Sequence, residues 1–150
     1  MNINLRPATE ADFPEIIGMI KELALFEKAP EKVTNSVEQM QREKDLFRCI
    51  MAENETGQIV GMALYFFAYY TWVGKSLYLD DLYIKPQYRG NGIGTMLLNE
   101  IMRISKEEKC TRVRWQVLDW NTPAIELYKK MGMTLDDEWI NCDWINESGQ

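Results

Sequence analysis

The stretch with the clearest capacity for chemistry is Tyr88-Arg89-Gly90-Asn91-Gly92-Ile93-Gly94-Thr95, which we expect to follow a strand and to open a helix. The first amides of a helix have no intrahelical partner, and its peptide dipoles leave a partial positive charge there, so this place suits an anion. Glycines let a phosphate approach the backbone, and Arg89 adds a permanent positive charge. The spacing therefore predicts a phosphate site, with a tight turn that binds nothing as the alternative.

Two common phosphate motifs do not fit this stretch. It is not a Walker loop, because no Lys-Ser or Lys-Thr pair follows the last glycine. It also lacks the dinucleotide-binding pattern, because the glycines do not follow the first strand of a βαβ repeat and no acidic residue ends a second parallel strand.

Asp80 and Asp81 are the next candidates, since they lie on an expected strand just before the glycine-rich stretch. Neighbouring side chains of a strand point to opposite faces, so only one of the two is expected to face a given cleft. A carboxylate there can hold an ammonium group or form an ordinary salt bridge. The chain has no histidine and no CxxC pair, which excludes Ser-His and Cys-His nucleophiles and the common zinc sites, and we expect no metal.

The elements that must position these residues belong to an ordinary globular chain. It has 150 residues, of which 46% are hydrophobic and 27% charged, and this suits one domain with one core. The net charge of −6 argues against a nucleic-acid partner, which would need a basic face. No apolar run approaches the roughly 20 residues of a membrane span, and the N-terminus lacks a secretion signal, so a cytoplasmic protein is expected.

Hydrophobic periodicity predicts strands and helices around one central sheet. Thr9 to Asp12 has the form of a capping box before a helix that starts at Phe13 and is stopped by Pro30. The order is β-α-α-β-β-β-α-β-α-β, an α/β (α+β) arrangement. The expected strands are 3–6, 47–52, 59–70, 76–84, 112–118 and 139–145, the last closing the sheet, and the other helices are 36–43, 93–106 and 123–131.

Two motifs resemble those of the GNAT N-acetyltransferase superfamily. The sequence Arg89-x-x-Gly92-x-Gly94, preceded by Leu77-Tyr78-Leu79-Asp80-Asp81-Leu82-Tyr83-Ile84, is similar to its acetyl-CoA signature. The sequence Trp120-Asn121-x-Pro123-Ala124-x-x-x-Tyr128-x-x-x-Gly132 is similar to its second motif. The resemblance extends over nearly the whole chain. It implies one GNAT domain over residues 1–150, with a central mixed, mostly antiparallel sheet flanked by helices, that transfers acetyl groups from acetyl-CoA.

A narrower resemblance points to the diamine acetyltransferases that act on spermidine, spermine or thialysine. Four segments carry it: 6–9, 20–24, 72–79 and 88–94. Polyamine enzymes of this type have an acid two residues before the Trp of the Trp-Gly-Lys region, whereas this chain has Tyr70 there, and the segment after Gly132 is shorter. A lysine analogue or another mono- or diamine is therefore as plausible a substrate as a polyamine.

The resemblance also implies roles in binding the coenzyme. Backbone groups of Leu82, Tyr83 and Ile84 would pair with the pantetheine arm, and a local bulge would aim an amide at the thioester carbonyl. Arg89 and the amides of Gly90, Asn91, Gly92, Ile93, Gly94 and Thr95 would hold the diphosphate. Asn121 would bond to the pantetheine arm or cap its helix, Ala124 would lie beside the coenzyme, and Lys130 would reach the phosphates.

Two side chains would carry the reaction by the same resemblance. Tyr128 would act as general acid for the departing sulfur, and Asp80 would hold the ammonium form of the substrate and take its proton through a water. Glu27 would be a second acid for the amine, or a solvated helix end. Phe26, Trp72 and Trp139 would line the substrate site, although tryptophans at such positions can equally be core residues.

Three functions remain open at this point. The first is a small-molecule amine N-acetyltransferase that works by direct attack in a ternary complex, since no cysteine stands at a motif position to carry an acyl group. The second is an acetyltransferase for protein lysine or N-terminal amines. The third is a CoA-binding sensor without turnover. The resemblance implies a homodimer in addition.

Overall fold

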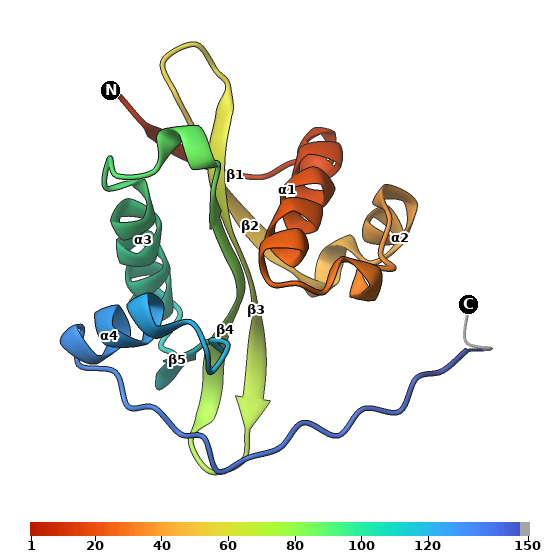
Figure 1. Ribbon diagram of the computed structural model, residues 1–150, viewed down its shortest axis with the longest axis vertical. Helices are drawn as coiled ribbons and strands as arrows, with labels where there is room; N and C mark the ends of the chain where they lie inside the picture. The colour runs from red at the N-terminus through yellow and green to blue at the C-terminus, as the bar shows by residue number, and fades with distance from the viewer. Residues whose placement is uncertain (148–150) are drawn as a thin grey trace. The chain divides into compact units, whose positions relative to one another are not determined.

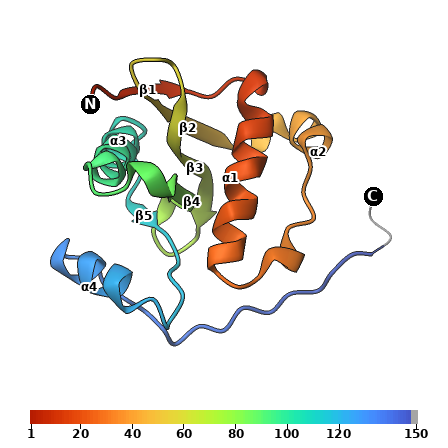
Figure 2. The same cartoon turned by 45° about the horizontal axis from the view of Figure 1, so that its top comes forward.

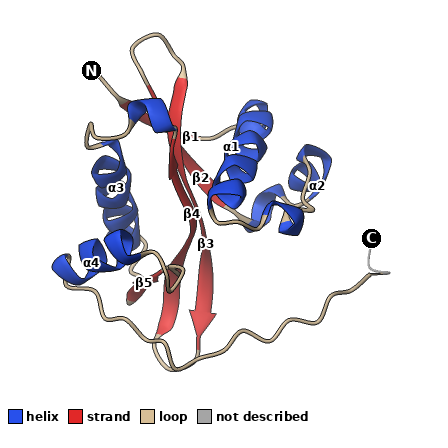
Figure 3. Cartoon of the chain, viewed as in Figure 1, coloured by secondary structure: helices blue, strands red, loops and turns tan. Residues whose placement is uncertain are grey.

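A five-stranded sheet forms the centre of the first of two compact units, which covers residues 1–116. The second unit starts at Val117, and the computed structural model describes residues 1–147 of the chain. The strands lie in the order β1-β2-β3-β4-β5, and all neighbours are antiparallel except β4 and β5 (Figure 3). Their bounds are Asn4–Pro7, Arg48–Glu53, Ile59–Tyr70, Gly74–Ile84 and Arg112–Arg114. The expected mixed, mostly antiparallel sheet is confirmed.

Helices cover both faces of this sheet (Figures 1 and 2). Helix α1 (Phe13–Phe26) and the short α2 (Val37–Arg42) lie on one face, and α3 (Ile93–Glu107) lies on the other. Each face has its own apolar cluster, because alternate strand residues point to opposite sides. Ile16 and Met19 pack with Met62 under α1, whereas Leu97 and Ile101 pack with Leu77 under α3.

The start of α1 is tied to the first strand by a buried carboxylate. Asp12 accepts a hydrogen bond from the Thr9 amide at 2.8 Å, as the capping-box pattern predicts. The same carboxylate receives two bonds from the Arg6 guanidinium, at 2.8 and 2.9 Å. Because this pairing favours the charged form, it holds the pKa of Asp12 below its ordinary value. The entry to α1 is thereby held against β1.

Two of the predicted strands differ from the structure. The strand predicted for 112–118 is only Arg112–Arg114, because its ladder with β4 ends at the pair Tyr78–Arg114. The strand predicted for 139–145 is wrong: these residues form no strand, and the edge of the sheet is β5. Its alternating pattern is strand-like, but a strand exists only when a neighbouring strand completes its hydrogen bonds, and the sheet formed by the described residues ends at β5.

The second unit contains α4 (Thr122–Lys130), followed by an irregular segment up to residue 147. Pro123 stands in the first turn of α4, as expected, since a missing amide costs nothing there. Within residues 1–147, no helix combines the length and the apolar character that crossing a membrane requires.

We predict that Leu97→Ala destabilises the fold by about 3 kcal/mol, because Leu97 is fully buried under α3 and the truncation leaves a cavity. Its neighbour Met96 is 37% exposed, so Met96→Ala is the matched control and should cost less than about 1 kcal/mol. Urea denaturation monitored by tryptophan fluorescence measures both values. Equal losses for the two variants would contradict the packing described for α3.

Candidate active site

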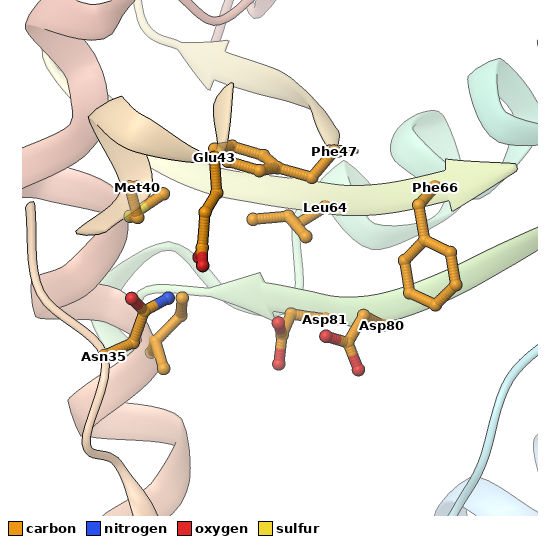
Figure 4. Close-up of a pocket in the computed structure, with 9 residues that line it drawn as sticks. Asn35, Met40, Glu43, Phe47, Leu64, Phe66, Asp80 and Asp81 are labelled. Carbon is orange, nitrogen blue, oxygen red and sulfur yellow. The ribbon is translucent and has the colours of Figure 1, made fainter. Parts of the chain in front are cut away.

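An extra residue in β4 interrupts its pairing with β3. Leu64 pairs with Asp81 and Tyr65 pairs with Leu79, so Asp80 has no partner of its own and forms a β-bulge. A bulge breaks the alternation of side chains along a strand. Asp80 and Asp81 accordingly line the same pocket, and Figure 4 shows both carboxylates beside one another. The expectation that only one of them can face a given cleft is wrong for this reason.

The pocket lies on the α1 face of the sheet and has a volume of about 160 Å³. A cavity of roughly this size holds one molecule of benzene, so there is space for a short aliphatic chain. Its walls are apolar, and its polar groups are three carboxylates and an amide (Figure 4). The apolar lining is Ile20, Met40, Phe47, Leu64 and Phe66, and the polar lining is Asn35, Glu43, Asp80 and Asp81.

Asn35 and Glu43 were missed by sequence reasoning. Asn35 precedes the cap of α2, where its side chain accepts a bond from the Ser36 amide at 2.9 Å, and Glu43 follows the last residue of that helix. No motif or spacing marks either residue as functional. They flank α2 on its two sides, and both line the pocket together with Leu64 of β3 and Asp81 of β4.

The carboxylates at the bulge repel one another. Burial raises the pKa of Asp81 to about 7, and the charges of Asp80 and Glu27 contribute to the shift. Loss of hydration raises the pKa of Asp80, and partial burial together with Asp80 raises the pKa of Glu27. Within the described chain, no lysine or arginine forms an ion pair with these three acids. The salt-bridge alternative for Asp80 is therefore not observed, and a bound cation would relieve the repulsion.

The glycine-rich stretch leads into α3 as an exposed loop. Gly90 and Gly92 have φ angles of +83° and +78°, which favour glycine, and a side chain at either would meet nothing within 4 Å. Gly92 is the N-cap of α3 and supplies no capping side chain. The first helical bond runs from the Met96 amide to the Gly92 carbonyl at 3.1 Å, so the three preceding amides have no acceptor within the helix. These amides can bind an anion.

Arg89 connects this loop to the end of β4. Its Nε donates to the Ile84 carbonyl at 2.8 Å, and its guanidinium lies 5.3 Å from the centre of the Tyr83 ring. Asn91 donates to the Tyr88 carbonyl at 3.0 Å, which braces the turn from inside. The loop and the end of β4 are thus fixed to one another.

The last part of β4 has one bare edge. β5 pairs only with Ser76 to Tyr78, so among residues 1–147 no strand lies beside the segment from Asp80 to Ile84 on the side away from β3. Tyr83 is buried on the α1 face, where its hydroxyl donates to Glu22 at 2.9 Å, whereas Leu82 and Ile84 are half-buried. Backbone groups on this edge can pair with an extended ligand.

The other predicted site residues occupy various positions. Phe26 ends α1 and Trp72 lies in the β3–β4 turn; both are exposed and neither lines the pocket. In the second unit, Asn121 is the N-cap of α4 without a side-chain capping bond, and Tyr128 is half-buried, which raises the pKa of its phenol. Also in this unit, Ala124 is half-buried, Lys130 is exposed, and the Trp139 indole donates to Asp136 at 2.8 Å.

The comparison with known families decides the identity of this arrangement. Residues 12–133 match the family model described as "Acetyltransferase (GNAT) family". The chain belongs to the GNAT acetyltransferase family. This GNAT protein is accordingly an acetyltransferase enzyme, as its motifs predicted.

Named relatives of this GNAT protein include two kinds of amine acetyltransferase. A thialysine N-epsilon-acetyltransferase from Mus musculus is 38% identical over 96% of this chain and 93% of its own length. A spermidine/spermine N(1)-acetyltransferase-like protein 1 from Homo sapiens is 34% identical over 85% of this chain, but only 20% of its own length. Among solved structures, a possible acetyltransferase from Clostridium difficile 630 has a TM-score of 0.80 at 21% identity, and the match covers 97% of this chain and all of the other. This last likeness supports the fold.

We predict that Asp81→Asn changes how the stability of this GNAT protein depends on pH. A carboxyl whose pKa rises from 3.8 to about 7 on folding stabilises the fold below pH 4, and that contribution is lost as the pH rises to 7. The variant lacks this loss, so its stability relative to wild type should improve by about 2 kcal/mol between pH 4 and pH 8. Denaturant unfolding at both pH values tests this, with the exposed Asp45→Asn as control; parallel curves for Asp81→Asn and wild type would refute it.

Proposed function

We propose that the protein transfers the acetyl group of acetyl-CoA to a primary amine of a small molecule, by direct attack in a ternary complex. The amine would be a diamine, a polyamine or a lysine analogue. The observation that carries this proposal is the bulge at Asp80, because it sets two carboxylates in one apolar-walled pocket beside the bare edge of β4. The relatives named for thialysine and for spermidine or spermine support the same class of substrate.

The coenzyme would bind along the bare edge and the start of α3. Backbone groups of Leu82 to Ile84 would pair with the pantetheine arm, and the amides from Gly90 to Thr95 would hold the diphosphate together with Arg89. The fit is supported by the exposed loop, its glycine N-cap and the amides that lack helical acceptors. Asn121, Ala124 and Lys130 would also bind the coenzyme, as the resemblance of their segment to the family's second motif implies.

The amine would enter as an ammonium ion and bind at the carboxylates. Asp80 would take its proton through a water, which leaves a lone pair on the nitrogen for attack on the thioester carbonyl carbon. A C–N bond forms and the C–S bond breaks; the sulfur receives the proton of the Tyr128 phenol, and the nitrogen then loses its second proton, which returns through water to the Tyr128 oxygen. A phenol is protonated at neutral pH, as a general acid must be, and burial raises the pKa of Tyr128 further. Glu27 would add negative charge for the substrate, and Phe26, Trp72 and Trp139 would provide apolar surface.

The proposal extends to the organisation of the protein. The family match from 12 to 133 runs across the boundary between the two units, which supports a single acetyltransferase domain made of both. A cytoplasmic homodimer is part of the same proposal.

The substrate class is tested by a thiol-release assay with acetyl-CoA and a panel of diamines, polyamines, lysine analogues and lysine-containing peptides. We expect turnover of the small amines. Turnover of peptides alone would establish a protein acetyltransferase instead, and tight CoA binding without any turnover would establish a sensor.

We predict that Gly92→Glu weakens CoA binding by at least about 100-fold, because it places a carboxylate at the N-cap where the diphosphate would bind. Gly57→Glu is a matched control, since Gly57 has a similar φ of +82° and equally open surroundings in the β2–β3 turn. Both variants carry the same backbone strain, but only the first should lose affinity in titration calorimetry. The same affinity in both variants would place the coenzyme elsewhere.

We predict that Tyr128→Phe lowers kcat by roughly 100-fold and leaves the KM for acetyl-CoA within about threefold, because it removes the proton for sulfur without removing the ring. Tyr69→Phe makes the same change on a side chain that is 78% exposed in β3 and should leave kcat unchanged. Steady-state kinetics measures both. A kcat for Tyr128→Phe equal to that of wild type would exclude the phenol as the acid.

A further inference from the structure

Two arginines on β5 lie against one tyrosine on the pocket side of the sheet. The guanidinium of Arg112 is 4.5 Å from the centre of the Tyr70 ring, and that of Arg114 is 5.1 Å away. Stacking on an aromatic face leaves the N–H groups at the rim of a guanidinium available for hydrogen bonds in its plane. Tyr70 thus holds two positive charges side by side.

Neither arginine has an acceptor within residues 1–147. Within this range no side-chain hydrogen bond or ion pair involves Arg112 or Arg114, although both residues are half-buried. The Nε of Arg112 is completely buried and has no partner at all. Arginine cannot relieve this by losing its proton, and buried donors in proteins almost always have an acceptor. The buried Nε of Arg112, with the guanidinium of Arg114 beside it, therefore favours an anion from outside the chain.

These arginines and the acidic pocket share one face of the sheet. Arg114 pairs with Tyr78 and Tyr78 pairs with Phe66, which lines the pocket and stacks on the Tyr78 ring at 5.2 Å. The next rung holds Leu64 and Asp81. Strand spacings therefore separate the Cα atoms of Asp81 and Arg114 by about 8 Å.

The Tyr78 phenol lies between the two charged groups. Burial is the main cause of its raised pKa; Asp80 raises that pKa further, and Arg114 lowers it. One side chain therefore experiences both the negative and the positive end of this surface. A ligand lying over Phe66 and Tyr78 would meet carboxylates at one end and guanidinium groups at the other.

We propose that Arg114 and Arg112 bind the α-carboxylate of an amino-acid substrate whose terminal amine lies at Asp80 and Asp81. The inference rests on the proposed function and narrows its substrate to basic amino acids such as lysine, ornithine and their analogues. Such a molecule carries an ammonium and a carboxylate separated by a short aliphatic chain, which matches the charges and the apolar rungs between them. A guanidinium binds a carboxylate with two parallel hydrogen bonds. A polyamine would instead bring an ammonium against two guanidinium groups and is disfavoured.

Matched substrate pairs test this proposal. L-lysine and 1,5-diaminopentane carry the same terminal amine, as do L-ornithine and 1,4-diaminobutane, and the diamines lack the carboxylate. We expect the wild-type enzyme to have a kcat/KM at least about 10-fold higher for the amino acid of each pair. Arg114→Gln should lower kcat/KM for the amino acids by about 10- to 100-fold through KM, and should leave it unchanged or higher for the diamines.

Arg48→Gln is the matched control for Arg114→Gln. Arg48 also lies over an aromatic ring, 5.7 Å from the centre of Phe67, but Phe67 packs with the cluster on the α3 face. This variant should leave the preference within each pair unchanged. Circular dichroism of Arg114→Gln checks its fold, and the wild-type comparison needs no variant.

The outcomes distinguish a failure of the carboxylate subsite from a failure of the proposed amine acetyltransferase function. Equal or better turnover of the diamines by wild type, or an equal loss on both members of a pair in Arg114→Gln, would overturn the carboxylate subsite and leave the amine acetyltransferase intact. An absence of turnover with every amine would overturn both. A preference for amino acids that disappears in Arg114→Gln and persists in Arg48→Gln supports the proposal.

Discussion

The single extra residue in β4 is the constraint on which the rest of the site depends. At Asp80 the ladder with β3 gains one residue, and the strand changes character there. Before the bulge β4 is an interior strand, paired on both sides; after it, one edge is bare. The same irregularity turns two adjacent carboxylates toward one pocket. A regular strand would have sent one of the two carboxylates toward the opposite face of the sheet.

The charges left by this geometry are not neutralised within the described chain. Acids gather at the bulge, and burial and mutual repulsion raise their pKa values. The guanidinium groups of Arg114 and Arg112 lie one and two rungs away without an ion pair. Other charged side chains on the surface do form ion pairs, for example Lys75 with Glu108 and Lys44 with Glu10. Unpaired, partly buried charges cost stability, so a fold tolerates them where a ligand of opposite charge binds. The pocket face of the sheet carries such unpaired charges at both ends, the carboxylates at the bulge and the guanidinium groups on β5.

Much of the framework could be predicted because it depends on local chemistry. Three of its features can be recognised from a few neighbouring residues. They are the hydrophobic period of α1, the capping box at Thr9 and Asp12, and the glycines before α3. The motif positions likewise identified the family before any fold was known.

The rest could not be predicted because it depends on pairing between distant segments. The sequence Leu79-Asp80-Asp81 does not indicate a bulge, because the bulge is defined by the pairing of these residues with Leu64 and Tyr65 of β3. Glu43 reaches the pocket through the connection from α2 to β2, which carries no motif. The arginines of β5 become a candidate site only because the fold brings them against Tyr70 of β3, two strands away. The strand expected at 139–145 failed for the same reason, since its alternating pattern cannot supply a partner.

Amide hydrogen exchange along β4 and the start of α3, followed by NMR with and without CoA, tests the central claim most directly. If the strand edge that the bulge leaves bare receives the coenzyme, exchange at 82–84 and at 93–95 slows on adding CoA, while the amides of 75–79 change little. Unchanged exchange at 82–84 and 93–95 at saturating CoA would contradict this account.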